Sequence, residues 1–100
     1  MRTYFVAVRV TPLSENQFFG KVEDVSIYFW INDETPEKVM ERVNAYLFKN
    51  HWKLDTLEKD AAEVTAADFS DNEDGMMGFW KAKQTGFAAR VIAKQKPEQG

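Results

Sequence analysis

The stretch "VSIYFWI", residues 25–31, decides the fold, because it is a strand with large apolar side chains on both faces. A strand turns successive side chains to opposite faces. One face therefore carries Val25, Ile27, Phe29 and Ile31, and the other carries Ser26, Tyr28 and Trp30. A half-solvated strand would instead alternate apolar and polar residues. The aromatic pair on the second face predicts that this face also meets something apolar.

The composition fits one small globular domain. The chain has 100 residues, of which 44% are hydrophobic and 14% aromatic. A disordered chain would contain fewer such residues. We expect a single compact domain over residues 1–93, followed by a frayed C-terminal tail over residues 94–100.

Cysteine is absent, which excludes disulfides, thiolate catalysis and cysteine-based metal sites. The first residues lack the apolar core of a signal peptide. No stretch approaches the roughly 20 apolar residues that span a bilayer. These features predict a cytoplasmic protein that does not bind a membrane.

The charge of the chain is separated into two segments, although the net charge is only −3. Acidic residues concentrate in 55–74 and basic residues in 81–96. The two segments either complement each other, within the chain or between protomers, or form ordinary solvated surface. A nucleic-acid-binding protein would show a basic excess or stripe, so we expect no nucleic acid as a partner.

Four segments have the alternation and the β-branched or aromatic content of strands. They cover residues 3–10, 23–31, 52–58 and 87–94. Residues 59–64 fit either a continuation of the third strand or a helical turn. A loop over 11–21 joins the first two strands.

Two segments have the apolar spacing of helices. The first is the segment 32–50, with Thr35 as N-cap and Pro36 in the first turn. The second covers 70–86, with a capping box at its start and Gly86 as C-cap. Its apolar residues indicate either helix core or a soft apolar groove; they are Met76, Met77, Phe79 and Trp80.

The element order is therefore β-β-α-β-α-β, which predicts an α+β fold. We expect a two-layer sandwich with a mixed or antiparallel sheet of about four strands. Right-handed crossovers would place both helices on one face of that sheet.

The opposite face would then be open and aromatic. Three explanations compete for what covers it: a second copy in a symmetric dimer, a ligand, or the chain's own loop 11–21 or C-terminal tail. Tyrosine and tryptophan suit interfaces because each combines a large apolar body with a polar group. We predict the ligand-binding or interface residues to be Phe5, Arg9, Tyr28, Trp30 and His51.

Motifs for catalysis are missing from the sequence. His51 is the single histidine and could form an acid–base couple with Asp55, but a lone histidine in a short loop is more often a solvated residue. There is no nucleophile elbow, phosphate loop or EF-hand spacing. We expect no metal, no cofactor and no catalytic residues, so the sequence leans against an enzyme.

Two hypotheses for function remain. The first is a non-catalytic interaction or accessory module that acts as a homodimer through the aromatic sheet face. The alternative is a binder of, or modest enzyme on, a small aromatic or anionic molecule in a pocket on the sheet face or between sheet and helix. An acidic, immunity-like role against a basic partner ranks below both.

Overall fold

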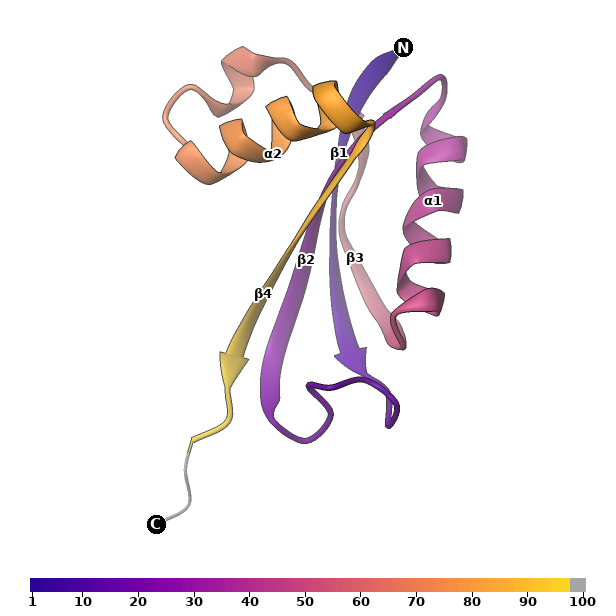
Figure 1. Cartoon of the computed structure of the whole chain (residues 1–100), viewed down its shortest axis with the longest axis vertical. Coiled ribbons are helices and arrows are strands. Elements are labelled where there is room, and N and C mark those ends of the chain that lie inside the picture. Colours follow the sequence, from indigo (N-terminus) through magenta and orange to yellow (C-terminus); the bar gives the residue numbers. More distant parts are fainter. Residues whose placement is uncertain (98–100) are drawn as a thin grey trace.

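In the computed structural model of the chain, which describes residues 1–97, four antiparallel strands form one open sheet (Figure 1). The strand order across the sheet is β3-β1-β2-β4. The elements are β1 (Arg2–Pro12), β2 (Val22–Asp33), α1 (Pro36–Lys49), β3 (Trp52–Glu63), a 3-10 turn η1 (Ala66–Phe69), α2 (Glu73–Thr85) and β4 (Phe87–Gln95). The predicted α+β class, the four-stranded sheet and the element order are confirmed.

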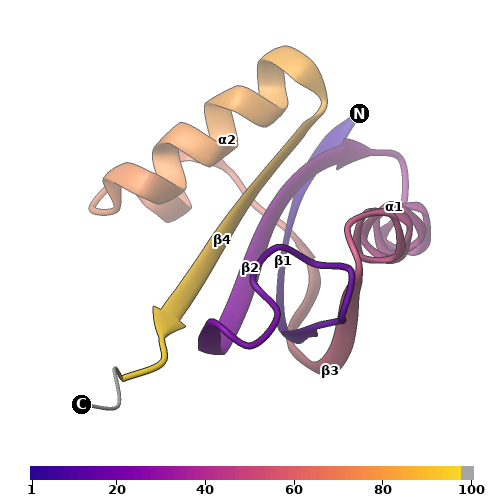
Figure 2. The ribbon, with the colours of Figure 1, turned by 60° about the horizontal axis from the view of Figure 1, so that its bottom comes forward.

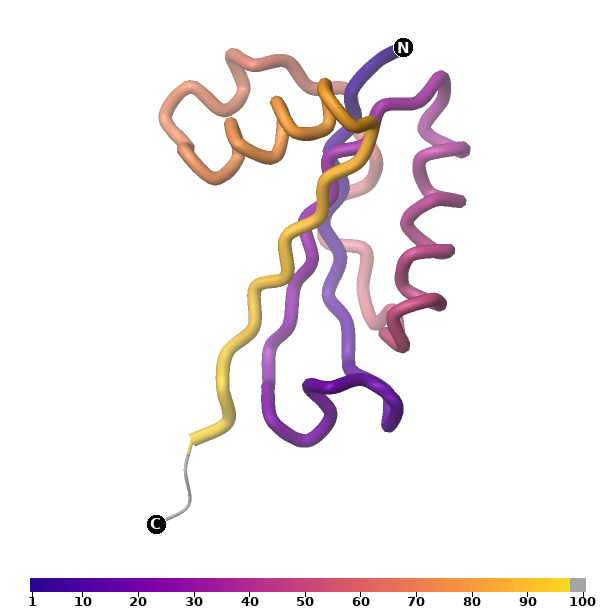
Figure 3. The backbone as a smooth tube through the Cα atoms, viewed as in Figure 1, coloured from indigo at the N-terminus to yellow at the C-terminus, as the bar shows by residue number. Residues whose placement is uncertain are grey.

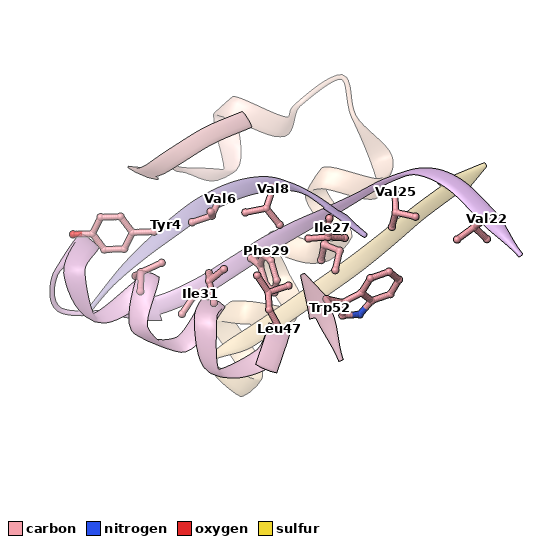
Figure 4. Packing of buried hydrophobic residues seen from close by; sticks show 13 residues of the cluster. Tyr4, Val6, Val8, Val22, Val25, Ile27, Phe29, Ile31, Leu47 and Trp52 are labelled. Atoms are coloured by element: carbon pink, nitrogen blue, oxygen red, sulfur yellow. The ribbon is translucent and has the colours of Figure 1, made fainter. Parts of the chain in front are cut away.

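Helix α1 covers the first face of the sheet. Thr35 caps it, accepting a hydrogen bond from the Lys38 backbone N–H at 3.2 Å. Its apolar stripe is buried against the strands (Figure 4). This main core consists of Tyr4, Val6, Val8, Val10, Val22, Val25, Ile27, Phe29, Ile31, Val39, Val43, Leu47 and Trp52.

Helix α2 covers part of the second face, so the two helices lie on opposite faces and not on one as expected. A second cluster joins Trp30 of β2, Ala88 of β4 and Phe79 of α2 to Phe69 of η1. In Figures 1 and 2, α2 lies at the β4 side of the sheet and α1 at the β3 side. The aromatic residues of the second face thus belong to a second small core.

The strand directions explain this difference. Strands β2 and β3 both run antiparallel to β1, so α1 crosses between parallel strands, where the right-handed rule applies. Strand β4 runs antiparallel to β2 and therefore to β3. The connection through α2 consequently leaves and re-enters the sheet at the same end (Figure 3), and the rule for parallel strands does not constrain its face.

The two edges of the sheet differ in regularity. Strand β3 continues to Glu63. Of the two alternatives for residues 59–64, the continued strand is therefore observed, and it ends at Glu63. Its pairing with β1 shifts register at three places, and most of its residues are exposed. Strand β4 pairs regularly with β2 from Phe87 to Ile92. It ends at Gln95, two residues into the tail expected to fray, and residues 98–100 lie outside those described.

The start of α2 differs from the expected Ser70. The helix begins at Glu73, and Asn72 caps it by accepting a hydrogen bond from the Gly75 backbone N–H at 2.9 Å. The predicted C-cap is confirmed, because Gly86 has a left-handed backbone with φ of 89°.

The two internal glycines of α2 are contact points for aromatic rings. A Cβ on Gly78 would stand 2.6 Å from Cε2 of Trp30 and overlap the ring. A Cβ on Gly75 would stand 3.1 Å from Cγ of Phe69 and overlap its neighbouring ring carbon. The missing side chains therefore let both rings lie directly against the helix backbone.

Gly78→Ala tests this contact through the sign of its effect. In an unobstructed helix the change stabilises by about 1 kcal/mol. Here the added methyl overlaps the Trp30 ring, so we expect a loss of about 1–3 kcal/mol in the free energy of unfolding. Denaturant titration measures it, and a gain in stability would contradict the packing of Trp30 against α2.

Candidate functional site

A groove of about 810 Å³ lies between α2 and β4. Exposed apolar side chains of α2 form one wall, with Met77 65% and Trp80 52% exposed. Residues Ala88, Ala89 and Arg90 of β4 form the other wall. Large exposed apolar side chains beside a concave surface are typical of binding sites.

Trp30 forms the floor of the groove and is only 3% exposed. Its ring centroid lies 5.3 Å from that of Phe5 and 6.3 Å from that of Phe69. Its buried Nε1 has no acceptor among the described residues. An unsatisfied buried donor costs about 1–3 kcal/mol. The groove thus lies over a buried indole whose Nε1 has no acceptor within the described part of the protein.

The rim of the groove carries charges of both signs. Asp71, Glu73 and Asp74 lie near the start of α2, Lys81 lies further along the helix, and Arg90 lies on β4. Arg90 and Asp74 form an ion pair at 3.3 Å, with both side chains at least half exposed. Such exposed pairs contribute little to stability, so Arg90 can change partner when something binds.

The groove follows the open edge of β4. Its wall includes Ala88, Ala89 and Arg90. The side chains of Ala88 and Arg90 lie on one face of the sheet, and that of Ala89 lies on the other. The Asn32 backbone N–H donates to Gly86 O at 3.0 Å, so these two residues are a hydrogen-bonded pair between the two strands. By antiparallel alternation, Ala88 and Arg90 direct their backbone groups toward β2. The N–H and C=O groups of the intervening residues, Phe87, Ala89 and Val91, point outward.

Three of the predicted site residues come together. The ring centroid of Phe5 lies 5.6 Å from that of Tyr28 and 5.3 Å from that of Trp30. Arg9 lies further along the same face and forms an ion pair with Asp24 at 3.3 Å. His51 lies apart from all four, at the junction of α1 and β3.

The expectation of an open aromatic face is wrong for its Phe5 and Trp30 half, because η1 and α2 cover it. Loop 11–21 does not reach this half; its Phe18 stacks on Trp52, on the side of α1, with centroids 6.0 Å apart. The remainder of the face carries polar pairs, as when Ser26 donates to Glu58 at 2.8 Å, together with the exposed Ile92. The predicted homodimer stays a prediction.

Several lining residues of the groove were absent from the predicted site, although the α2 methionines and Trp80 were recognised as a possible apolar groove. Phe69 falls between the segments predicted as strand and helix. The signal that could have identified the groove floor is the pair Gly75 and Gly78, which interrupts an otherwise favourable helix with residues that admit close contact.

A smaller pocket of about 340 Å³ includes His51. Burial raises the pKa of Tyr46 in this pocket. A backbone hydrogen bond, and then the Ser14 hydroxyl, lower the pKa of Glu15. Both shifts move the pKa further from neutral pH, so neither group changes its protonation state near pH 7. Asp55, the expected partner of His51, accepts a hydrogen bond from Thr11 instead.

His51 has a structural constraint that its sequence position did not reveal. Its φ of 60° lies in the left-handed region. A residue other than glycine is strained there by about 1–2 kcal/mol. The position directly follows the C-cap Asn50, where glycine is the commonest residue.

We expect His51→Gly to raise the free energy of unfolding by about 1 kcal/mol, because glycine adopts this conformation freely. Urea titration measures the change. Lys49→Gly, in the last turn of α1, is the control and should lose about 1 kcal/mol. A destabilised His51→Gly variant would show that the imidazole makes contacts that outweigh the strain.

Within residues 1–97, no three histidine or carboxylate side chains gather where they could hold a metal ion. No helix of this part of the chain is both long and apolar enough to cross a membrane.

Comparison with protein families, with curated proteins and with solved structures found no match to this chain. Its function is therefore argued from the geometry of the groove.

Proposed function

We propose that this protein is a non-catalytic interaction module, which binds its partner in the groove between α2 and β4. The observation that carries this proposal is the combination of an apolar groove with exposed Met77 and Trp80 on its wall. Full burial of such a side chain stabilises by roughly 1.5–3 kcal/mol, and these two forgo part of that unless a partner covers them. The lack of cysteine suits a reducing compartment, and we place the protein in the cytoplasm.

A second candidate function is the binding of a small aromatic anion in the same groove. Two observations favour it: Nε1 of Trp30 lacks an acceptor, and Lys81 and Arg90 stand on the rim. An aromatic body would contact the indole and methionine side chains, while an anionic group would meet the cations. Both functions use the same walls and can be tested with one probe.

Titration with the aromatic anion anilinonaphthalenesulfonate tests whether the groove binds apolar ligands. We expect saturable binding with a change in tryptophan emission. Met77→Glu should weaken it about tenfold, because it places a carboxylate in the apolar wall and repels the sulfonate.

Phe48→Glu is the matched control, since Phe48 is 86% exposed on α1, at the other face of the sheet. It makes the same change in charge away from the groove and should leave binding unaltered. Equal loss in both variants, or loss in neither, would refute the groove as the binding site.

A further inference from the structure

The edge of β4 and the groove beside it form one continuous surface. The outward backbone groups of Ala89 lie in the wall of the groove, as derived above. An unpaired strand edge is a template for another strand. A partner that supplies an extended segment would therefore extend the sheet and fill the groove together.

We infer that the partner is a second copy of this chain, which pairs its β4 antiparallel to β4 across a two-fold axis. This inference rests on the proposed function, because it names the occupant of the groove. An isologous contact needs a self-complementary surface. Here β4 provides both the unpaired edge and, from the second copy, the residues that lie against that edge.

The apolar complement comes from the second half of β4. Ile92 is 42% exposed and lies on the same face as Ala88 and Arg90. Antiparallel pairing brings the C-terminal half of one β4 beside the N-terminal half of the other. It therefore brings Ile92 of the second copy beside the groove.

The charges of the two halves are also complementary. The groove rim near the start of α2 carries Asp71 and Glu73, which form no ion pair among residues 1–97. The C-terminal half of β4 carries Lys94, which forms an exposed ion pair with Glu23 at 3.9 Å, and Lys96 follows it. Pairing of two copies brings the basic end of each β4 toward the acidic rim of the other, which favours association.

Repulsion between like charges favours one alignment of the two β4 strands over the others. In a pair of β4 strands, the residues whose backbone groups point outward, such as Ala89 and Val91, must lie opposite one another. An axis beside Arg90 would place it opposite its own copy, which is unfavourable. An axis at Ala89 would leave the end of β4 unpaired. An axis at Val91 pairs the whole strand and places Arg90 opposite Ile92.

The oligomeric state of the full chain tests the inference. Sedimentation at micromolar to submillimolar concentrations should give twice the chain mass. Val91→Lys places two ammonium groups across the axis and should shift the protein to monomer. Leu57→Lys makes the same change on the other edge strand, where Leu57 is 39% exposed, and should remain dimeric. Melting curves show whether both variants are folded.

Cysteine cross-linking tests the register, since the chain contains no cysteine of its own. Paired residues that exchange hydrogen bonds have Cα atoms about 5.5 Å apart, within the range of a disulfide. Val91→Cys should form a cross-linked dimer on mild oxidation, and Leu57→Cys should not. Cross-linking through Leu57→Cys, with none through Val91→Cys, would overturn the β4 pairing.

The outcomes separate this inference from the proposed function. A wild-type chain that stays monomeric, but whose binding of anilinonaphthalenesulfonate is weakened by Met77→Glu alone, would overturn the second copy as partner and leave the groove as a site for another molecule. A monomer without groove-specific binding would overturn both. A dimer that Val91→Lys dissociates, and whose monomeric variant binds anilinonaphthalenesulfonate more tightly than the wild-type dimer, would support both.

Discussion

The structure depends on the contact between the indole of Trp30 and the backbone of α2 at Gly78. A tryptophan on the second face of β2 would be exposed in a simple two-layer sandwich. Here the absence of a side chain at residue 78 lets the helix approach the ring directly, which buries Trp30 to 3% exposure. The same contact fixes the position of α2 beside β4. The close approach of α2 to Trp30 therefore determines the groove between α2 and β4.

Both ends of α2 are tied to the sheet by other means. Asn32 donates from its side-chain amide to Ala82 O at 2.9 Å, and accepts a hydrogen bond from Thr3. Phe69 packs beneath the start of the helix, against Trp30 and Phe79. Because polar contacts hold one end and aromatic contacts the other, the wall of the groove has a defined place relative to β4 before any partner arrives. A preformed wall lowers the conformational entropy lost on binding.

The sequence predicted the elements better than their arrangement. Helix α1 could be located from Thr35 and Pro36, because capping is a local property. The face that α2 covers could not be predicted, because it depends on which edges β3 and β4 occupy, and that is decided by pairing between distant segments. Trp30 was recognised as unusual, but its environment was not. Gly78 has a low helix propensity, yet it is the point at which helix and sheet meet.

The irregular pairing of β3 limits how far an assembly could grow. Bulges bend a strand and interrupt the row of groups that a neighbour would need. With three register shifts along β3, the sheet has one edge suited to pairing and one that is not. A sheet with two regular edges could add copies without end and form fibres. With only one such edge, pairing through β4 would close after a single step, so the bulges of β3 oppose polymerisation.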